Sequence, residues 1–174
     1  MNGSPNRRII LIALAVLGLD QATKLLVLRL LGPTQESVVV DGFFKFVHWG
    51  NTGAAWSLFR DQNDLLAIVS ILALLGLFLW RRHFHIQNVL GQISLGLIFG
   101  GIAGNLMDRL RYHQVIDFLR FYLNRRSGEE LGFPAFNMAD SAICIGVGLL
   151  ILISWKQEQE NASGRAAAKP ASVP

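Results

Sequence analysis

The stretch LLAIVSILALLGLFLW, from Leu65 to Trp80, decides the fold class. It carries no charged residue, and its length approaches the roughly 20 apolar residues that a helix needs to cross a bilayer. Three other segments share this character: Ile9–Leu31, which is interrupted by DQATK, Val89–Met107 and Met138–Trp155. We therefore predict an all-α polytopic membrane protein with four transmembrane helices.

The composition points the same way. Of 174 residues, 52% are hydrophobic and 16% are charged, whereas about a quarter are charged in soluble domains. The net charge of +4 does not indicate nucleic-acid binding, because the Lys and Arg residues form no stripe and mostly border the apolar segments, where anionic lipid headgroups are the expected partner. The single cysteine, Cys144, excludes an internal disulfide.

The sequence indicates one membrane domain over residues 1–155 and a disordered tail over 156–174, which is rich in polar and small residues. Arg7 and Arg8 followed by the apolar run Ile9–Leu19 are also typical of a cleavable signal peptide. A retained span is favoured because the apolar run resumes as LLVLRLL after Lys24.

Two long connectors carry their own patterns. Residues 33–64 contain ESVVVDGFFKFVHW, whose alternating polar and apolar residues predict short strands or a hairpin. Residues 108–136 contain VIDFLRFYL, an amphipathic segment that we expect to lie in the membrane interface. The four tryptophans fall at span ends or in the first connector, as an interfacial aromatic belt requires: Trp49, Trp56, Trp80 and Trp155.

With four spans, the first and third connectors must emerge on one side and both termini on the other. Asn51, Asp117 and Asp140 therefore share one side of the membrane. The orientation itself stays open, because basic residues flank the spans on both sides. The terminal side has Arg7, Arg8, Arg81, Arg82 and Lys156; the other side has Arg60, Arg109, Arg111, Arg120, Arg125 and Arg126.

Two carboxylates lie beside the apolar segments. Asp117 is in VIDFL, and Asp140 is one turn into the fourth segment within FPAFNMADS. A charge at mid-membrane costs roughly 2.5–3.5 kcal/mol, so such acids indicate function. Two carboxyl groups held together share one proton and activate a water molecule between them, as in aspartic proteases, without any metal or cofactor. Alternatively, Asp140 is a helix cap, and Asp117 is an interfacial charge paired with an arginine.

Five motifs in order together resemble the lipoprotein signal peptidases, also called signal peptidase II. They are DQATK (20–24), NTGAAWS (51–57), GGIAGNLMDR (100–109), VIDF (115–118) and FPAFNMADS (133–141), and the resemblance covers about residues 9–155. It implies a bacterial inner-membrane aspartic endopeptidase. Such an enzyme cuts the signal peptide from a prolipoprotein just before a cysteine that carries diacylglycerol.

The resemblance also implies residue roles. Asp117 and Asp140 match the motifs of the two catalytic aspartates. Residues that would bind substrate or support the aspartate pair are Asn51, Gly53, Asn105, Arg109, Asn137, Asp20, Lys24, Gly101 and Gly104. Asp20 and Lys24 are four residues apart and can neutralise each other within the first span. Gly96, Gly100 and Gly104 form a small-residue face that lets another helix approach closely.

The family topology implies cytoplasmic termini, a small extracytoplasmic β-rich region and a site near the outer face of the inner membrane. The implied partners are a prolipoprotein carrying diacylglyceryl-cysteine and membrane lipids, and we expect a monomer without metal or nucleic acid. The charged segment LRFYLNRRSGEELG between Asp117 and Asp140 departs from the resemblance. It bears on how substrate is gripped rather than on whether the pair forms.

Three other mechanisms or functions are compatible with parts of the sequence. A Ser–Lys protease would use Ser57 with Lys24 or Lys45 as base. A metal site would recruit His113, Asp117 and Asp108, although HExxH is absent. A small proton-coupled transporter would place acids at several depths along a path, whereas here only Asp20 and Lys24 lie deep.

Overall fold

The computed structural model describes residues 4–53, 58–84, 87–125 and 129–167. Its four long helices are α1 (Pro5–Leu30), α2 (Asn63–Trp80), α3 (Val89–Tyr112) and α4 (Met138–Ala167), and a short 3₁₀ turn, η2 (Arg81–His83), follows α2. Within the described ranges these four helices are long and apolar enough to cross a membrane. This confirms the predicted helices and extends the third to Tyr112.

Local sequence explains where the helices begin and end. The Ser4 hydroxyl accepts the Arg7 backbone N–H at 3.4 Å, and Pro5 occupies the first turn of α1. The Asn88 side chain accepts the Leu90 N–H at 3.0 Å and so caps α3. Helix α3 ends at Tyr112. The next residue, His113, has a left-handed φ of 56°, which turns the chain into the following strand.

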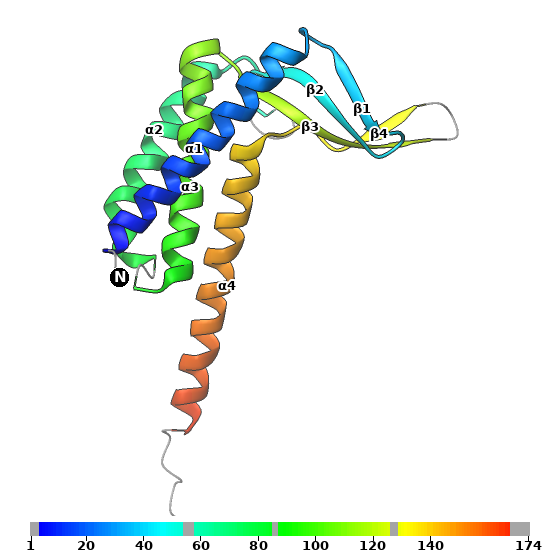
Figure 1. Cartoon of the computed structure of the whole chain (residues 1–174). Coiled ribbons are helices and arrows are strands. Elements are labelled where there is room, and N and C mark those ends of the chain that lie inside the picture. The colour runs from blue at the N-terminus through cyan, green and yellow to red at the C-terminus, as the bar shows by residue number, and fades with distance from the viewer. Residues whose placement is uncertain (1–3, 54–57, 85–86, 126–128, 168–174) are drawn as a thin grey trace, which may run out of the picture.

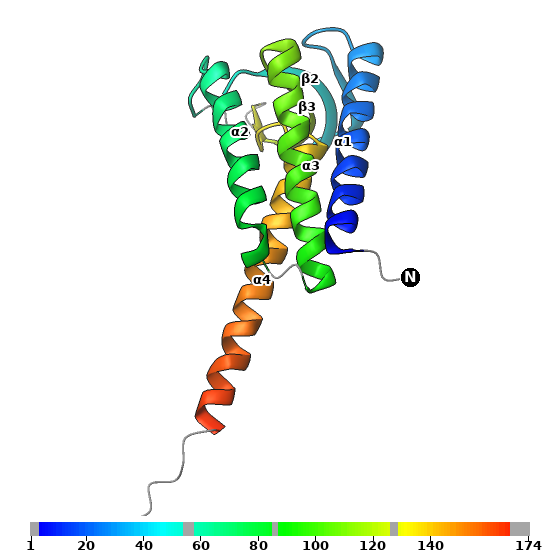
Figure 2. The ribbon, with the colours of Figure 1, turned by 90° about the vertical axis from the view of Figure 1, so that its left-hand side faces the viewer.

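Helix α3 is the centre of the bundle and lies between α1 and α2, with α4 behind it (Figure 2). Glycines allow the close approach on two of its faces. A Cβ on Gly100 would stand 2.6 Å from the Ala13 carbonyl oxygen of α1, and one on Gly101 would stand 2.5 Å from the Ala139 carbonyl oxygen of α4. The predicted packing role of the glycines is therefore confirmed, with two neighbours rather than one.

Four antiparallel strands form a sheet in the order β1 (Glu36–Val40), β2 (Phe44–Asn51), β3 (Val115–Asn124) and β4 (Glu130–Gly132). The sheet projects sideways from one end of the bundle, past the start of α4 (Figure 1). The hairpin expected in the first connector is confirmed as β1 and β2. The segment VIDFLRFYL is a strand inside this sheet, because its alternating residues pair with β2.

The two faces of the sheet differ in chemistry. Phe44 pairs with Phe121, and both rings lie on the face that carries Asp117 further along β3, with ring centroids 5.0 Å apart. Lys45 pairs with Arg120 on the opposite face. Lys45 forms ion pairs there with Glu36 at 2.6 Å and Glu130 at 2.8 Å. One face, called the aromatic face below, therefore carries a cluster of Phe rings. The other carries the charged cluster, with the rings of Tyr122 and Trp49 packed against Lys45 and Arg120.

Helix α4 corrects one expectation. Residues 156–167, predicted to be part of a disordered tail, continue α4 as far as Ala167, and residues 168–174 lie outside the described ranges. The segment WKQEQENASGRAA is rich in Gln, Glu, Lys and Ala, which favour helix, and a preceding span has already nucleated it. In Figure 1, α4 extends well past the other three helices.

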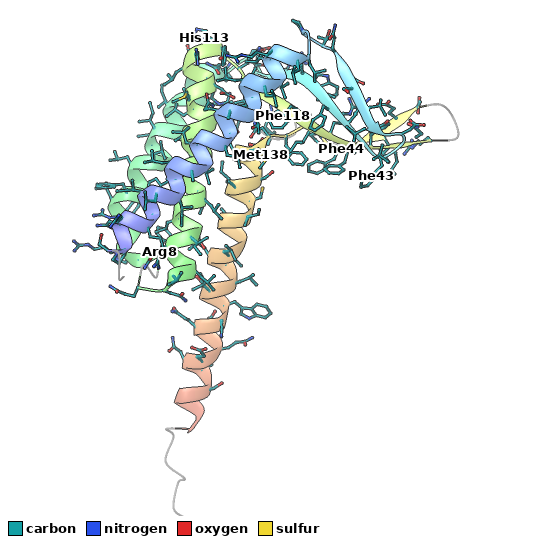
Figure 3. The ribbon with its side chains drawn as sticks, in the orientation of Figure 1. Arg8, Phe43, Phe44, His113, Phe118 and Met138 are labelled. Carbon is teal, nitrogen blue, oxygen red and sulfur yellow. The ribbon has the colours of Figure 1, made fainter. Side chains whose placement is uncertain are left out.

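The sheet and the N-terminus lie at opposite ends of the bundle (Figure 1). Arg8 lies at the end near the N-terminus and His113 lies at the opposite end, while Phe118 and Met138 lie where the sheet meets the start of α4 (Figure 3). The sheet and both candidate aspartates are therefore on the side opposite to the N-terminus, as the parity of four spans predicts. Three residues named in the predictions above lie outside the described ranges: Trp56, Ser57 and Arg126.

Candidate active site

The two candidate aspartates come from different elements and meet at the junction of sheet and bundle. Asp117 is the third residue of β3, and Asp140 is the third residue of α4. Asp117 is only 4% exposed, and Asp140 is half-buried. The start of a strand and the start of a helix thus place two carboxyl groups in one poorly hydrated space.

Asn137 joins the two aspartates. Its side-chain amide donates to Asp117 Oδ1 at 2.8 Å, and its backbone N–H donates to Asp140 Oδ2 at 3.2 Å. Its side-chain oxygen accepts the Asp140 N–H at 2.9 Å, which makes a reciprocal cap at the start of α4. Asn137 is completely buried. The capping role considered for this motif is therefore real, and the same residue also contacts Asp117.

Burial, and after it the neighbouring charge of Asp140, raises the pKa of Asp117 to about 7. Hydrogen bonds from Asn51 and Asn137 oppose the increase because they favour the ionised carboxylate. A carboxyl group that titrates near neutrality, beside a second carboxyl group, can hold or release a proton under physiological conditions. This is the property that acid–base catalysis requires.

Asn51, the last residue of β2, and the loop that follows it support Asp117 from the other side. The Asn51 side-chain amide donates to Asp117 Oδ2 at 3.0 Å, while its oxygen accepts the Gly53 N–H at 2.9 Å. Arg109, at the end of α3, donates through Nη2 to the Gly53 carbonyl at 2.7 Å. Asn63, at the start of α2, exchanges hydrogen bonds with Arg109 at 3.2 and 3.4 Å. This loop is thus anchored to α2 and α3.

A buried ionic network lies behind Asp140. Lys24 forms ion pairs with Asp20 at 2.8 Å and with Asp108 at 2.7 Å, and all three side chains are at most 2% exposed. The predicted pairing of Asp20 with Lys24 is confirmed, but Asp108 was missed as the third member. Lys24 also donates to Asn105 Oδ1 at 3.0 Å, and Asn105 Nδ2 donates to Asp140 Oδ1 at 2.7 Å.

The same network fixes the start of α4. Asp20 Oδ1 accepts the Ala139 backbone N–H at 2.9 Å, which satisfies a free donor in the first turn of α4. Gly104 leaves the space that this contact needs, because a Cβ there would stand 2.5 Å from Asp20 Oδ2. Asp108 Oδ2 in turn accepts the Ile116 N–H of β3 at 3.2 Å. The elements that carry the two aspartates are thus tied to one ion cluster.

Sequence reasoning missed Asp108 and Asn63 as members of this site. A signal for Asp108 was available: it is three residues after Asn105 on α3, so the two side chains lie on the same face of the helix, and Asn105 was already predicted to support the aspartates. Asn63 gave no such signal, because its contact with Arg109 crosses 46 residues. The other sequence-predicted residues around the aspartates are brought together as described.

The rival chemistries find little support in the geometry. His113 and Asp117 would share a face if they were four residues apart on one helix, but His113 follows α3 and Asp117 lies in β3. Within the described ranges, no group of three His, Cys, Asp or Glu residues could hold a metal ion. For the Ser–Lys alternative, Lys24 and Lys45 each form ion pairs with two carboxylates, so both ammonium groups already have partners.

Comparisons with known proteins agree with this geometry. The family model described as signal peptidase (SPase) II matches residues 12–156. A lipoprotein signal peptidase of Geobacter metallireducens is 42% identical over 89% of this chain and 95% of its own length. One of Syntrophotalea carbinolica is 37% identical over 86% and 92%, respectively.

Two solved structures, each described as a bacterial membrane enzyme, share the fold. One has a TM-score of 0.72 and 30% identity, and the match covers 95% of this chain and 94% of the other. The second has a TM-score of 0.67 and 32% identity, with coverage of 83% and 90%. The likeness therefore extends over the bundle together with the sheet.

Proposed function

The chain belongs to the signal peptidase II family, and on that premise we propose that Asp117 and Asp140 are its catalytic pair. It is an inner-membrane aspartic endopeptidase of bacteria. It removes the signal peptide from diacylglyceryl-modified prolipoproteins, cutting just before the modified cysteine. The comparisons do not support the alternative of a proton-coupled transporter.

One observation carries the assignment of the pair. Two carboxyl groups, 23 positions apart in the chain and carried by different elements, contact the same buried residue, Asn137. A purely structural cap would need only Asp140. The second contact, to Asp117, brings together two acids whose mutual repulsion the fold must overcome, and such an arrangement is typical of a catalytic site.

In the proposed reaction, the pair holds one proton between its two carboxyl groups. The ionised carboxylate takes a proton from a water molecule, whose oxygen attacks the scissile carbonyl carbon. The other carboxyl group gives its proton to the carbonyl oxygen. Collapse of the resulting diol breaks the C–N bond, with the proton delivered to the leaving amine, so the pair ends with one proton again.

The supporting residues position these groups. Asn51 and Asn137 hold Asp117, whereas Asn105 and Asn137 hold Asp140. Gly53 and Arg109 keep the loop of Asn51 in place. The remaining four keep α1, α3 and α4 at the spacing that brings the aspartates together: Asp20, Lys24, Gly101 and Gly104.

We further propose that residues 1–155 form the peptidase domain, that both termini are cytoplasmic and that the pair lies near the outer membrane face. The aromatic face of the sheet supports this location, because exposed Phe rings are stabilised when they leave water for the acyl boundary of a membrane. Phe43 and Phe133 are 53% and 56% exposed there. In this arrangement the substrate's lipid stays in hydrocarbon while its extended segment crosses the pair, and a single chain suffices.

The test is cleavage in vitro of a precursor that carries diacylglyceryl-cysteine, beside the same precursor with an unmodified cysteine. We expect the purified chain to cut only the modified precursor, just before the cysteine, and to do so after treatment with a metal chelator. Equal cleavage of both precursors would contradict the proposed lipid requirement. Loss of cleavage with chelator, restored by metal, would contradict the metal-free pair.

A further inference from the structure

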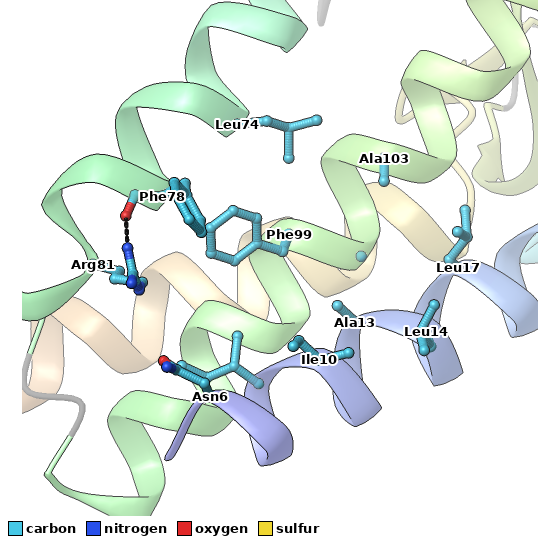
Figure 4. Close-up of a pocket in the computed structure, with 12 residues that line it drawn as sticks. Asn6, Ile10, Ala13, Leu14, Leu17, Leu74, Phe78, Arg81, Phe99 and Ala103 are labelled. Carbon is cyan, nitrogen blue, oxygen red and sulfur yellow. Dashed lines mark hydrogen bonds between the residues drawn. The ribbon is translucent and has the colours of Figure 1, made fainter. Parts of the chain in front are cut away.

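An apolar groove lies between α1, α2 and α3, on the side of the bundle that α4 does not cover (Figure 4). It has a volume of about 530 Å³. Its walls come from all three helices and include Ile10, Leu14, Leu17, Leu74, Phe78 and Phe99. Small side chains on the facing helices, Ala13 and Ala103, leave the space open. The groove is separate from the aspartates, which lie at the other end of the bundle.

Polar groups occur at one end of the groove only. Asn6 of α1 and Arg81, directly after α2, lie together at the end nearest the N-terminus (Figure 4). The Arg81 guanidinium donates to the Phe78 carbonyl at 2.6 Å and stands 4.3 Å from the Phe78 ring centroid. No carboxylate in the described ranges pairs with it. A guanidinium has five N–H donors, so it retains capacity for an anion.

We propose that this groove binds one anionic phospholipid of the leaflet on the N-terminal side. An acyl chain lies along the apolar wall, and the phosphate contacts Arg81. The charge of the site supports this occupant, since Arg82 directly follows Arg81, and Arg7 and Arg8 at the start of α1 lie at the same end of the bundle (Figure 3). Basic residues at such a position attract anionic headgroups, and a guanidinium matches phosphate oxygens in a bidentate manner.

The length of the groove fits a single leaflet. From Asn6 to Leu17 it follows α1 for eleven residues, which is about 17 Å at 1.5 Å per residue. The hydrocarbon region of one leaflet is about 15 Å, half of the total of roughly 30 Å. One chain of a phospholipid anchored at Arg81 would therefore reach the deep end of the groove.

The volume argues against a helix as occupant. A helix about 17 Å long and 10 Å wide would fill roughly 1,300 Å³, more than the about 1,100 Å³ of empty space in and before the groove. A whole helix therefore fits this groove poorly. A single extended hydrocarbon chain is much thinner and fits it.

The test is native mass spectrometry of the full chain with added phosphatidylglycerol or phosphatidylcholine of identical acyl chains. We expect one phosphatidylglycerol to bind about fivefold more tightly than phosphatidylcholine. Arg81→Gln should abolish this preference, whereas Arg82→Gln, which removes an adjacent charge outside the groove, should preserve it. Ala103→Phe should fill the groove and weaken binding of both lipids at least about tenfold.

Ala15→Phe is the matched control for Ala103→Phe, because Ala15 is exposed on α1 and does not line the groove. All four variants should cleave modified precursor at the wild-type rate, which shows that they fold. Equal binding of the two lipids by the unaltered chain would overturn the proposal, and so would unchanged binding in Ala103→Phe. Displacement of the lipid by precursor, or dimers that only Ala103→Phe disrupts, would assign the groove to another occupant and equally overturn it.

Discussion

Lys24 donates a hydrogen bond to the side-chain oxygen of Asn105 at 3.0 Å, and together with a donation from the Asn137 amide at 3.2 Å this contact determines which way the Asn105 amide points. With its oxygen held by an ammonium group, Asn105 must present its NH₂ group to Asp140, which it contacts at 2.7 Å. A charge on the first helix thereby controls a donor to an acid on the last helix.

Lys24→Met tests this control. Removing one partner of a buried ion pair generally costs about 3–5 kcal/mol. Here it leaves Asp20 and Asp108 without Lys24, and Asn105 Oδ1 keeps only the longer hydrogen bond from the Asn137 amide. We expect lower thermal stability and a lower kcat per folded molecule, with KM little changed. Lys45→Met is the matched control, because Lys45 is also a buried lysine between two carboxylates but lies in the sheet. It should lower stability alone; an equal fall in kcat would refute the specific role of Lys24.

Asp117→Asn and Asp140→Asn should each reduce cleavage of a modified precursor by at least about a thousandfold, within the range by which acid–base groups accelerate reactions. Both variants should insert and unfold like the parent chain. Asp64→Asn, a change of an exposed aspartate in the first turn of α2, should leave cleavage unaltered. Near-normal turnover by either of the first two variants would show that the pair is wrongly assigned.

The rate of cleavage should fall on the alkaline side of about pH 7. The pKa of Asp117 is raised to about 7, so this carboxyl group is protonated below that pH and loses its proton as the pH rises through it. The reaction needs one proton within the pair, and its loss removes the general acid. A profile of kcat/KM between pH 5 and 9, measured in one lipid environment, should show this limb; a flat profile through pH 8 would contradict the assignment.

Asn51→Ala should move that alkaline limb to higher pH. The amide of Asn51 donates to Asp117 Oδ2 and favours the ionised carboxylate, so its removal raises the Asp117 pKa further. Thr52→Ala changes the next residue, whose hydroxyl bonds to Asp61 rather than to the pair, and should leave the limb in place. A shift toward lower pH in Asn51→Ala would mean that another group produces the limb.

Gly104→Ala should destabilise the bundle by about 1–3 kcal/mol, as overpacking commonly does. Its methyl group would collide with Asp20 Oδ2 of α1 and press on Ala139 of α4, thereby pushing both helices away from α3. Gly148→Ala, in the same bundle, meets nothing within 4 Å and should be neutral or slightly stabilising. Thermal unfolding of the two purified variants distinguishes them, and equal midpoints would disprove the packing argument.

The parts of this fold that depend on local pattern were predictable from sequence. Apolar runs predicted the four helices, alternation predicted the first hairpin, and the spacing of Asp20 and Lys24 predicted their ion pair. Asp108 as a second partner of Lys24 was not predictable, because 84 residues separate them and only the packing of α1 on α3 brings them together. The continuation of α4 was missed because polar composition was interpreted as disorder, whereas helix propensity there is high.

The order of the elements along the chain also sets the order in which the residues of the site are synthesised. Asp20 and Lys24 are made first, Asp117 much later and Asp140 later still, yet the start of α4 is held by Asp20 from the other end of the sequence. A ribosome-bound chain that has inserted only its first three spans holds one carboxyl group of the pair and no means of sharing a proton. With Asp117 and Asp140 as the proposed pair, proteolytic competence therefore arrives only with the final span, so a partly synthesised copy cannot cleave peptide bonds.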